Sequence, residues 1–300
     1  MPDTVAYVNG KFVPAATACI TIFDRGFRWG DGLYEVERTF RHRVFRLHDH
    51  MLRLERSLHY AQIDPGLPIK NIEAAVEELV ERNSPAFDRD NDMEVCQIIT
   101  RGTMDEPDRA NVVMYCREVH WAQVTKDLRD GRRLVIASTR RIPHQCLAPS
   151  AKISNKMSQM VAEREVKGID PDARALMLDI HGNVAEDTSA NIFFVIGGKL
   201  CTPNLANCLP GISRKVTLEL AQKLGIQTEE GVYTPFDLWN CDEIFLTSTS
   251  PCLYGVTHLN GRKVGGAFPG PITKRLTEGW KEVVGMDFVA QALNMGGRRA

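Results

Sequence analysis

The sequence predicts a mixed α+β (α/β) fold with a smaller N-terminal domain and a larger C-terminal domain. A chain of 300 residues is long enough for about two domains. Both halves mix short strand-like runs with amphipathic helical runs, as α+β and α/β folds do. A polar stretch of mixed charge between them is typical of a domain boundary. We therefore expect an N-terminal α/β domain at residues 1–118, a linker at 119–130 and a C-terminal domain at 131–300.

The first half begins with a hairpin signal. The run AYVNGKFV places Asn9-Gly10 between two short apolar segments, and this dipeptide favours the two-residue turns of β-hairpins. Apolar residues recur at helical spacing in DHMLRLERSLHYAQI (49–63) and IKNIEAAVEELVERN (69–83), which predicts two helices. The run EVCQIITRG (94–102) predicts a strand.

The second half is predicted to be a series of strands interrupted by one strong helix. RRLVIAS opens it as a strand, and ARALMLDI, NVAEDTSANIFFVI and KLCTP follow with glycine-containing turns between them. SRKVTLELAQKLG predicts a helix with apolar residues on one face and Gly225 as its stop. DEIFLTSTS predicts another strand, Asn260-Gly261 a second turn, and the final GGRRA a frayed tail.

Composition and charge exclude several classes of function. Because 43% of residues are hydrophobic and 25% charged, the chain is an ordinary soluble protein. A formal net charge of -1 gives no reason to expect a nucleic-acid or anionic-membrane partner. No run of 18 apolar residues occurs, so we expect no membrane span. The start lacks a signal-peptide pattern, and the eight cysteines are scattered without a CxxC pair. We therefore expect reduced thiols and a cytoplasmic protein.

Two lysines lie four residues apart in APSAKISNKMSQMVAEREVKG. Ser154 or Asn155 can cap a helix that begins near 156, and Gly168 can end it. Lys156 then falls in the first turn, where the helix dipole disfavours a cation, so we expect it to point to water. Lys152 precedes the cap. Partial desolvation there would lower its pKa from about 10.4 and favour an amine nucleophile, although a solvated charge is the alternative.

Three further positions carry groups that suit a polar or anionic ligand. Glu186 lies between apolar strand runs and is either a surface-turn residue or a buried, paired acid. Ser213 follows Gly211 at the start of the predicted helix, where N–H groups and a hydroxyl suit a phosphate; an ordinary serine cap is the alternative. Arg53 is on a predicted helix, where most arginines are solvated.

Metal and nucleotide sites are not expected. The sequence has His48 and His50 close together and His59 further on, but a zinc site requires three or four converging nitrogen or sulfur ligands. We expect no metal. The chain contains neither GxGxxG nor a Walker motif, so nucleotide cofactors are not expected either.

Five motifs together resemble one family. LHDHMLRLERS, AKISN, GNVAEDTSANIFF, LPGISR and DEIFLTSTS occur in the order and at the spacings of the fold-type IV, pyridoxal-phosphate-dependent class IV aminotransferases. That family includes D-amino acid, branched-chain and (R)-amine aminotransferases and aminodeoxychorismate lyase. The resemblance runs from about Tyr7 to Trp280. Each motif is weak alone, but five in order form a specific pattern.

The resemblance implies a pyridoxal 5'-phosphate cofactor, a homodimer, a barrel-like mixed sheet in the C-terminal domain and a set of site residues. Lys152, and not Lys156, matches the Schiff-base lysine. Glu186 matches the acid that pairs with the cofactor's ring nitrogen, and Arg53 matches the phosphate-binding arginine. The other matches are Ile212, Ser213, Ser248 and Thr249 for the phosphate, Leu209 against the ring, and Tyr34 on the substrate side.

The proposed chemistry requires these residue types. Lysine is the side chain that offers a primary amine for imine formation and can then move a proton. An acid beside the ring nitrogen keeps that nitrogen protonated, so that the ring withdraws electrons. A fixed arginine and N–H donors suit a doubly charged phosphate.

The substrate is less clearly specified. The Lys152-x-x-Asn155 spacing and the run TRGT resemble the D-amino acid and (R)-amine enzymes. D-amino acid enzymes hold the substrate carboxylate with an Arg-x-His from the neighbouring subunit, and the nearest match here is Arg109-Ala-Asn111, on a longer loop. We expect transfer between a D-amino acid or (R)-amine and a 2-oxo acid. A branched-chain L-amino acid aminotransferase, an aminodeoxychorismate-type lyase and a non-catalytic protein remain as alternatives.

Overall fold

The computed structural model describes residues 4–88, 90–106 and 109–297, which form two compact units. Unit 1 contains the described residues of Met1–His120 and Ala151–Asn155, and unit 2 those of Trp121–Ser150 and Lys156–Ala300. The stretch expected to be a linker is largely helix α4 (Trp121–Asp130) of unit 2. The expectation was wrong there because Trp121 and Val124 give this polar stretch a buried apolar face.

Unit 1 is a six-stranded antiparallel sheet with two long helices. The strands lie in the order β2-β1-β6-β5-β3-β4. The elements are β1 (Val5–Val8), β2 (Lys11–Pro14), η1 (Ala15–Thr17), α1 (Arg25–Trp29), β3 (Gly32–Phe40), β4 (Arg43–Val44), α2 (Leu47–Ala61), α3 (Ile69–Asn83), η2 (Ser84–Ala86), β5 (Met93–Thr100) and β6 (Asn111–Glu118).

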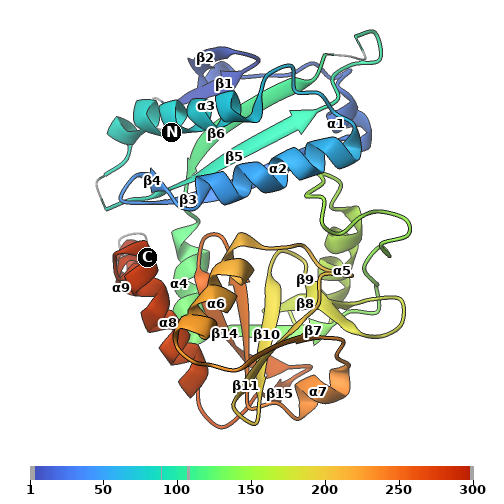
Figure 1. Cartoon of the computed structure of the whole chain (residues 1–300), viewed down its shortest axis with the longest axis vertical. Helices are drawn as coiled ribbons and strands as arrows, with labels where there is room; N and C mark the ends of the chain where they lie inside the picture. Colours follow the sequence, from blue (N-terminus) through green and yellow to red (C-terminus); the bar gives the residue numbers. More distant parts are fainter. Residues whose placement is uncertain (1–3, 89, 107–108, 298–300) are drawn as a thin grey trace. The chain divides into compact units, whose positions relative to one another are not determined.

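Helices α2 and α3 cover one face of this sheet (Figure 1). Their apolar residues, such as Met51, Leu54 and Ile72, pack with Val95 and Ile99 of β5 into one buried core. Alternation along β3 turns Leu33, Glu35 and Glu37 towards that core. A largely apolar face of the sheet therefore carries two acids.

Unit 2 is built on a nine-stranded mixed sheet. Its central path is β12-β11-β10-β13-β14-β7-β8-β9, and β15 pairs with β14. After α4 the elements are β7 (Arg132–Ile136), α5 (Met157–Lys167), β8 (Ala173–Leu178), β9 (Val184–Asp187), β10 (Asn191–Ile196), β11 (Lys199–Pro203), α6 (Ile212–Lys223), β12 (Thr228–Gly231), α7 (Pro235–Trp239), β13 (Glu243–Ser248), β14 (Cys252–Leu259), β15 (Arg262–Lys263), α8 (Pro271–Val284) and α9 (Phe288–Gly297).

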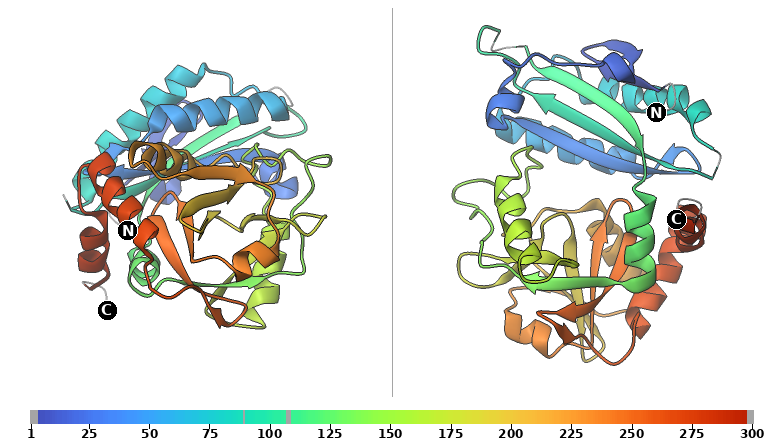
Figure 2. Two further views of the ribbon diagram at one scale, coloured as in Figure 1. Left: turned by 60° about the horizontal axis from the view of Figure 1, so that its bottom comes forward. Right: turned by 180° about the vertical axis from the view of Figure 1, so that it is seen from behind.

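This sheet curls around an apolar core that includes Leu134, Leu176, Ile192 and Leu246. Helix α5 packs against β8 on one side, and α4 with α9 lies on another (Figure 2). Ala162 and Val166 of α5 pack with Ala173 and Ala175 of β8 in a second buried cluster. The predicted fold class, a mixture of helices with a curled mixed sheet, is confirmed.

Several local predictions are also confirmed. Asn9-Gly10 and Asn260-Gly261 adopt positive φ angles between paired strands, as two-residue hairpin turns require. Gly225, at φ +66°, directly follows the cap of α6. The frayed-tail prediction is wrong in part, because α9 continues to Gly297; the remainder of GGRRA lies outside the described residues.

Among the helices of the described ranges, none combines the length and hydrophobicity that crossing a bilayer requires.

Candidate functional site

Lys152 is fixed in unit 1 at its backbone on two sides. Its carbonyl accepts a hydrogen bond from the N–H of Tyr34 in β3 (3.0 Å), and its own N–H donates to Ser57 Oγ in α2 (3.2 Å). The side chain is half-buried, and Nζ lies 4.3 Å from the centroid of the Tyr34 ring. A cation–π contact at this distance holds the amine against the ring face. The structure thus brings two predicted site residues, Lys152 and Tyr34, together.

Lys156 behaves differently from the expectation. Its Nζ donates to the carbonyl oxygen of Thr188 (3.0 Å) in unit 2, so it does not simply point to water. It is also the N-cap residue of α5, the position expected for Ser154 or Asn155, and its own side chain makes no capping hydrogen bond. The backbone carbonyl outcompetes water because it lies in a partly buried turn. This lysine therefore stabilises the turn.

Arg53 lies in a buried charged cluster of unit 1. Its Nε and Nη2 donate to the two oxygens of Glu35 (2.7 and 2.6 Å), and His50 Nδ1 lies 2.9 Å from the same carboxylate. Burial alone would raise the pKa of Glu35, but Arg53 and His50 hold it well below its usual range. Burial likewise lowers the pKa of His50, with Glu35 opposing it. Glu35 therefore fixes the orientation of the Arg53 guanidinium, although the position of Arg53 in the sequence suggested a solvent-exposed side chain.

The same cluster contains one group that could hold a metal. Oxygen and nitrogen atoms of Glu35, Glu37 and His50 lie within 4.8 Å of one another and are buried. Arg53 already binds Glu35 through two nitrogens, so a divalent cation there would face a guanidinium. The charge of Arg53 opposes metal binding at this place.

Glu186 is the buried, paired acid that was one of the two sequence interpretations. It lies in β9 with 6% of its surface exposed. Its Oε2 accepts from Asn191 Nδ2 (3.1 Å) and from the N–H of Leu209 (3.0 Å), and Oε1 lies 2.9 Å from Arg141 Nη2. Both oxygens of this carboxylate are therefore fixed by the fold, which is what an acid needs in order to face a ring nitrogen.

Arg141 is a functional candidate that sequence reasoning missed. Its guanidinium side chain is 11% exposed and provides the counter-charge of Glu186. Its N–H donates to Leu178 at the end of β8, which fixes the backbone beside the acid. The available signal was weak: three residues separate Arg140-Arg141 from the end of β7, and nothing in the sequence distinguishes the inward arginine from its exposed neighbour.

The start of α6 is shaped for an anion. Gly211 is its N-cap residue and itself offers no capping side chain. The first N–H groups of a helix have no intrahelical partner, so those of Ile212 and Ser213 are suited to phosphate oxygens. Ser213 Oγ donates to the carbonyl of Ser248 (3.0 Å), at the end of β13 and next to Thr249. A Cβ on Gly211 would lie 2.1 Å from Asn191 Oδ1, so a larger residue there would have to displace the Asn191 amide.

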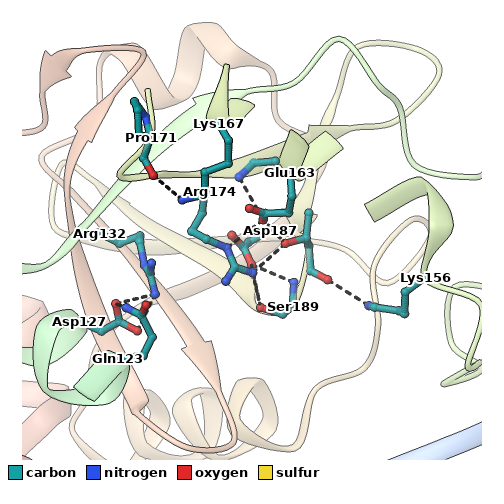
Figure 3. Close-up of polar contacts among 12 residues, drawn as sticks. Gln123, Asp127, Arg132, Lys156, Glu163, Lys167, Pro171, Arg174, Asp187 and Ser189 are labelled. Carbon is teal, nitrogen blue, oxygen red and sulfur yellow. Dashed lines mark hydrogen bonds and ion pairs between the residues drawn. The ribbon is translucent and has the colours of Figure 1, made fainter. Parts of the chain in front are cut away.

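A network centred on Arg174 fixes the turn between β9 and β10 (Figure 3). Its Nη2 donates to Thr188 Oγ1 (2.8 Å) and Ser189 Oγ (2.8 Å) and pairs with Asp187 (3.4 Å), while Nε donates to Glu163 of α5 (2.8 Å). The charge of Asp187 raises the pKa of Arg174, so this arginine stays charged. The turn separates Glu186 from Asn191, so the network helps to position both.

The predicted substrate residues Arg109 and Asn111 lie in unit 1. Arg109 has a side chain 70% exposed and pairs with Glu106 at 3.2 Å. The amide of Asn111 donates to Asp24 (2.6 Å) and accepts from Asn9 (2.8 Å), which anchors the start of β6. Their contact with substrate stays a prediction, and residues 107–108 of this loop lie outside the described residues.

Comparison with known proteins gives a consistent family. The family model "Amino-transferase class IV" matches residues 32–259. A Methanocaldococcus jannaschii protein, provisionally assigned as a branched-chain-amino-acid aminotransferase, is 32% identical over 92% of this chain and 95% of its own. The D-alanine aminotransferase of Bacillus licheniformis is 28% identical over 89% of this chain and 93% of its own.

A solved structure extends the likeness to the fold. The branched-chain aminotransferase of the thermophilic archaeon Thermoproteus uzoniensis, solved with norvaline, superposes with a TM-score of 0.84 at 26% identity, covering 94% of this chain and 95% of that chain. The matched family model spans all five motifs, including those that hold Lys152, Glu186 and the start of α6. The chain therefore belongs to the class IV aminotransferases and is a transaminase.

Proposed function

We propose that this transaminase uses pyridoxal 5'-phosphate, with Lys152 as the lysine that binds it covalently. The observation that carries the assignment is the different environment of the two lysines. The amine of Lys156 donates to the Thr188 carbonyl. By contrast, hydrogen bonds to β3 and α2 fix the backbone of Lys152, and its amine lies over the Tyr34 ring.

The residues of unit 2 fit such a cofactor. Glu186 is fixed at both oxygens, and the N–H of Leu209 that binds it lies only three residues before the start of α6. An acid for a ring nitrogen and N–H groups for a phosphate therefore come from one short segment. Arg53 of unit 1 supplies a cation whose direction is set by Glu35.

When bound, pyridoxal phosphate supplies an aldehyde that combines with amino groups and a ring that accepts electron density. Lys152 then moves a proton to or from the α-carbon of the substrate, as a general acid–base. Glu186, supported by Arg141, holds a proton on the ring nitrogen. Ser213, Ser248, Thr249 and Arg53 would anchor the phosphate, and Leu209 would pack against the ring.

Borohydride reduction of the holoenzyme followed by peptide mass spectrometry tests the lysine. We expect a pyridoxyl adduct on Lys152, and Lys156→Ala as the matched control should keep the adduct. An adduct on Lys156, or none on either lysine, would exclude the assignment.

For the substrate, we propose a D-amino acid or (R)-amine donor and a 2-oxo acid acceptor. The Lys152-x-x-Asn155 spacing, the TRGT run and the Bacillus licheniformis relative support it. A branched-chain L-amino acid donor is the second candidate, favoured by the relative that is 32% identical. Half-reactions with both enantiomers of alanine, leucine and 1-phenylethylamine, followed by cofactor absorbance, separate the two. Reaction with L-leucine alone would establish the second, and turnover without a 2-oxo acid would indicate a lyase.

We also propose a homodimer in which the 104–112 loop reaches the partner's site. The segment from Ile20 to Trp29 of unit 1 supports this, because Ile22, Phe23 and Phe27 are 69%, 61% and 73% exposed. Exposed apolar side chains in such a cluster mark protein contacts more often than solvent-facing surface. Sedimentation should give a dimer, and Phe27→Glu should shift it towards monomer. An active wild-type monomer would contradict the proposal.

A further inference from the structure

Glu37 is the one acid of the charged cluster in unit 1 whose charge has no evident balance. It is 0% exposed, and it lies two residues after Glu35 on the face of β3 that α2 covers. In the sheet it is level with Val95 of β5 and Cys116 of β6, both part of the apolar core. A carboxylate in such surroundings is costly unless it is paired.

The charged groups that face Glu37 do not supply that pairing. From α2, Arg53 directs Nε and Nη2 to Glu35, and His50 Nδ1 is 2.9 Å from Glu35 but 3.6 Å from Glu37. From β3, Glu35 adds a second negative charge. From β6, Cys116 contributes only a thiol, whose pKa burial raises to about 12. In the described part of the chain, His50 is the one base within 4 Å of Glu37.

Glu37 and Gln97 each have one buried oxygen atom that lacks a hydrogen-bond donor. Gln97 Nε2 donates to Glu37 Oε2 (2.6 Å), while Glu37 Oε1 and Gln97 Oε1 have no hydrogen-bond partner among the described residues. Both are acceptors as long as Glu37 is ionised. A single proton on Glu37 turns one into a donor, and an acid and an amide can then form two parallel hydrogen bonds.

We propose that Glu37 is held as a neutral carboxylic acid paired with Gln97, and that its neutrality keeps the charged cluster around Arg53 from repelling an anionic ligand. The second part rests on the proposed role of Arg53 as the anchor of the cofactor phosphate. Glu37 is then a positioning residue that acts through the electrostatics of Arg53 and touches no substrate.

The charge balance supports this arrangement. Burial and the neighbouring Glu35 raise the pKa of Glu37 well above its usual range. With Glu37 neutral, and with burial lowering the pKa of His50, Arg53 and Glu35 carry equal and opposite charges. An ionised Glu37 would make the cluster net negative and repel a phosphate dianion.

The protonation state is tested by comparing the unfolding of wild type and Glu37→Gln across pH, with the holoenzyme at one protein and cofactor concentration. The folded protein keeps the proton, whereas the unfolded chain releases it above about pH 4.3. Wild type should therefore lose stability relative to the variant as pH rises. The ratio of their unfolding equilibrium constants should change about tenfold per pH unit until the folded-state pKa is reached.

A constant ratio across pH, or a change in the opposite direction, would overturn the proposal. If Glu37→Gln folds poorly, infrared spectroscopy of the wild-type holoenzyme decides the question. We expect the carbonyl stretch of a protonated carboxyl group in wild type at neutral pH, with a matching loss in Glu37→Asn. Absence of that band would also overturn it.

The link to Arg53 is tested by equilibrium binding of pyridoxal phosphate to the apoprotein, with inorganic phosphate as competitor. Above the folded-state pKa of Glu37, the affinity of wild type should fall about tenfold relative to that of Glu37→Gln. This is the effect expected when one unit charge on Glu37 repels a phosphate charge over roughly 10 Å at an effective dielectric constant of about 20. Identical pH profiles would overturn the link. If Arg53→Lys leaves binding unchanged, the phosphate role of Arg53 fails, whereas the proton on Glu37 is judged separately by unfolding and infrared data.

Discussion

Removal of Arg141 should expose how strongly the fold depends on the counter-charge of Glu186. The two side chains are 11% and 8% exposed and lie 2.9 Å apart. Removing one partner of a buried ion pair costs about 3–5 kcal/mol, because the other charge stays buried. Asn191 and the Leu209 N–H still bind the carboxylate, so we expect the loss in Arg141→Ala to fall near the lower limit, about 3 kcal/mol.

Denaturant unfolding measures this loss, and the adjacent arginine is the matched control. Arg140 is more exposed and donates to the Ala137 carbonyl at 3.2 Å, so Arg140→Ala should cost within about 0.5 kcal/mol. In a Glu186→Gln background no charge requires neutralising, so Arg141→Ala should cost less. The cycle should give a coupling of about 2 kcal/mol.

Two outcomes would refute the reasoning. One is an equal loss in the Arg141 and Arg140 variants, and the other is a coupling close to zero. If Arg141→Ala does not fold, Arg141→Lys keeps the charge without the planar geometry and should show a smaller loss.

The remaining predictions concern the other site residues. Lys152→Ala should abolish transamination, whereas Lys156→Ala should cost roughly 1 kcal/mol of stability by unfolding and keep the pyridoxyl adduct. Glu186→Gln should keep cofactor binding and lower kcat by roughly 10²-fold in steady-state assays; near-wild-type turnover would place the acid elsewhere. Arg109→Ala should lower kcat/KM for amino acids roughly ten- to hundred-fold and spare (R)-1-phenylethylamine. Gly211→Ala should weaken cofactor binding measured by dialysis, because its Cβ would lie 2.1 Å from an amide oxygen; unchanged binding would contradict the close packing.

The elements of the fold could be predicted from the sequence because their signals are local. Asn-Gly turns, the helical spacing of α2 and α3, and the glycine after α6 each depend on residues within one turn or one strand pair. Helix α4 was missed because its polar composition resembles a linker, and only the burial of Trp121 and Val124 distinguishes it. Local patterns do not report which side chains a distant strand will cover.

In the candidate site, too, the sequence indicates local positions but not the contacts between residues that are distant in sequence. Lys152 and Glu186 stand in recognisable motifs, so their positions could be predicted, but the partners that hold them are far away in sequence. Arg141 is 45 residues from Glu186, and the Glu37–Gln97 pair spans 60 residues. Such contacts arise from strand register, which a single sequence does not reveal.

The two lysines show why contacts, rather than residue type, assign roles here. Both are half-buried and four residues apart, and both stand near the start of α5. Lys156 donates to Thr188 in the turn that Arg174 also binds, so its charge serves to fix the position of Glu186 and Asn191. Lys152 is instead held through its backbone, and its amine lies against the face of the Tyr34 ring. The amine of Lys156 is thus engaged by a structural contact, whereas the fold holds Lys152 through its backbone. This difference supports our proposal that Lys152 is the reactive lysine.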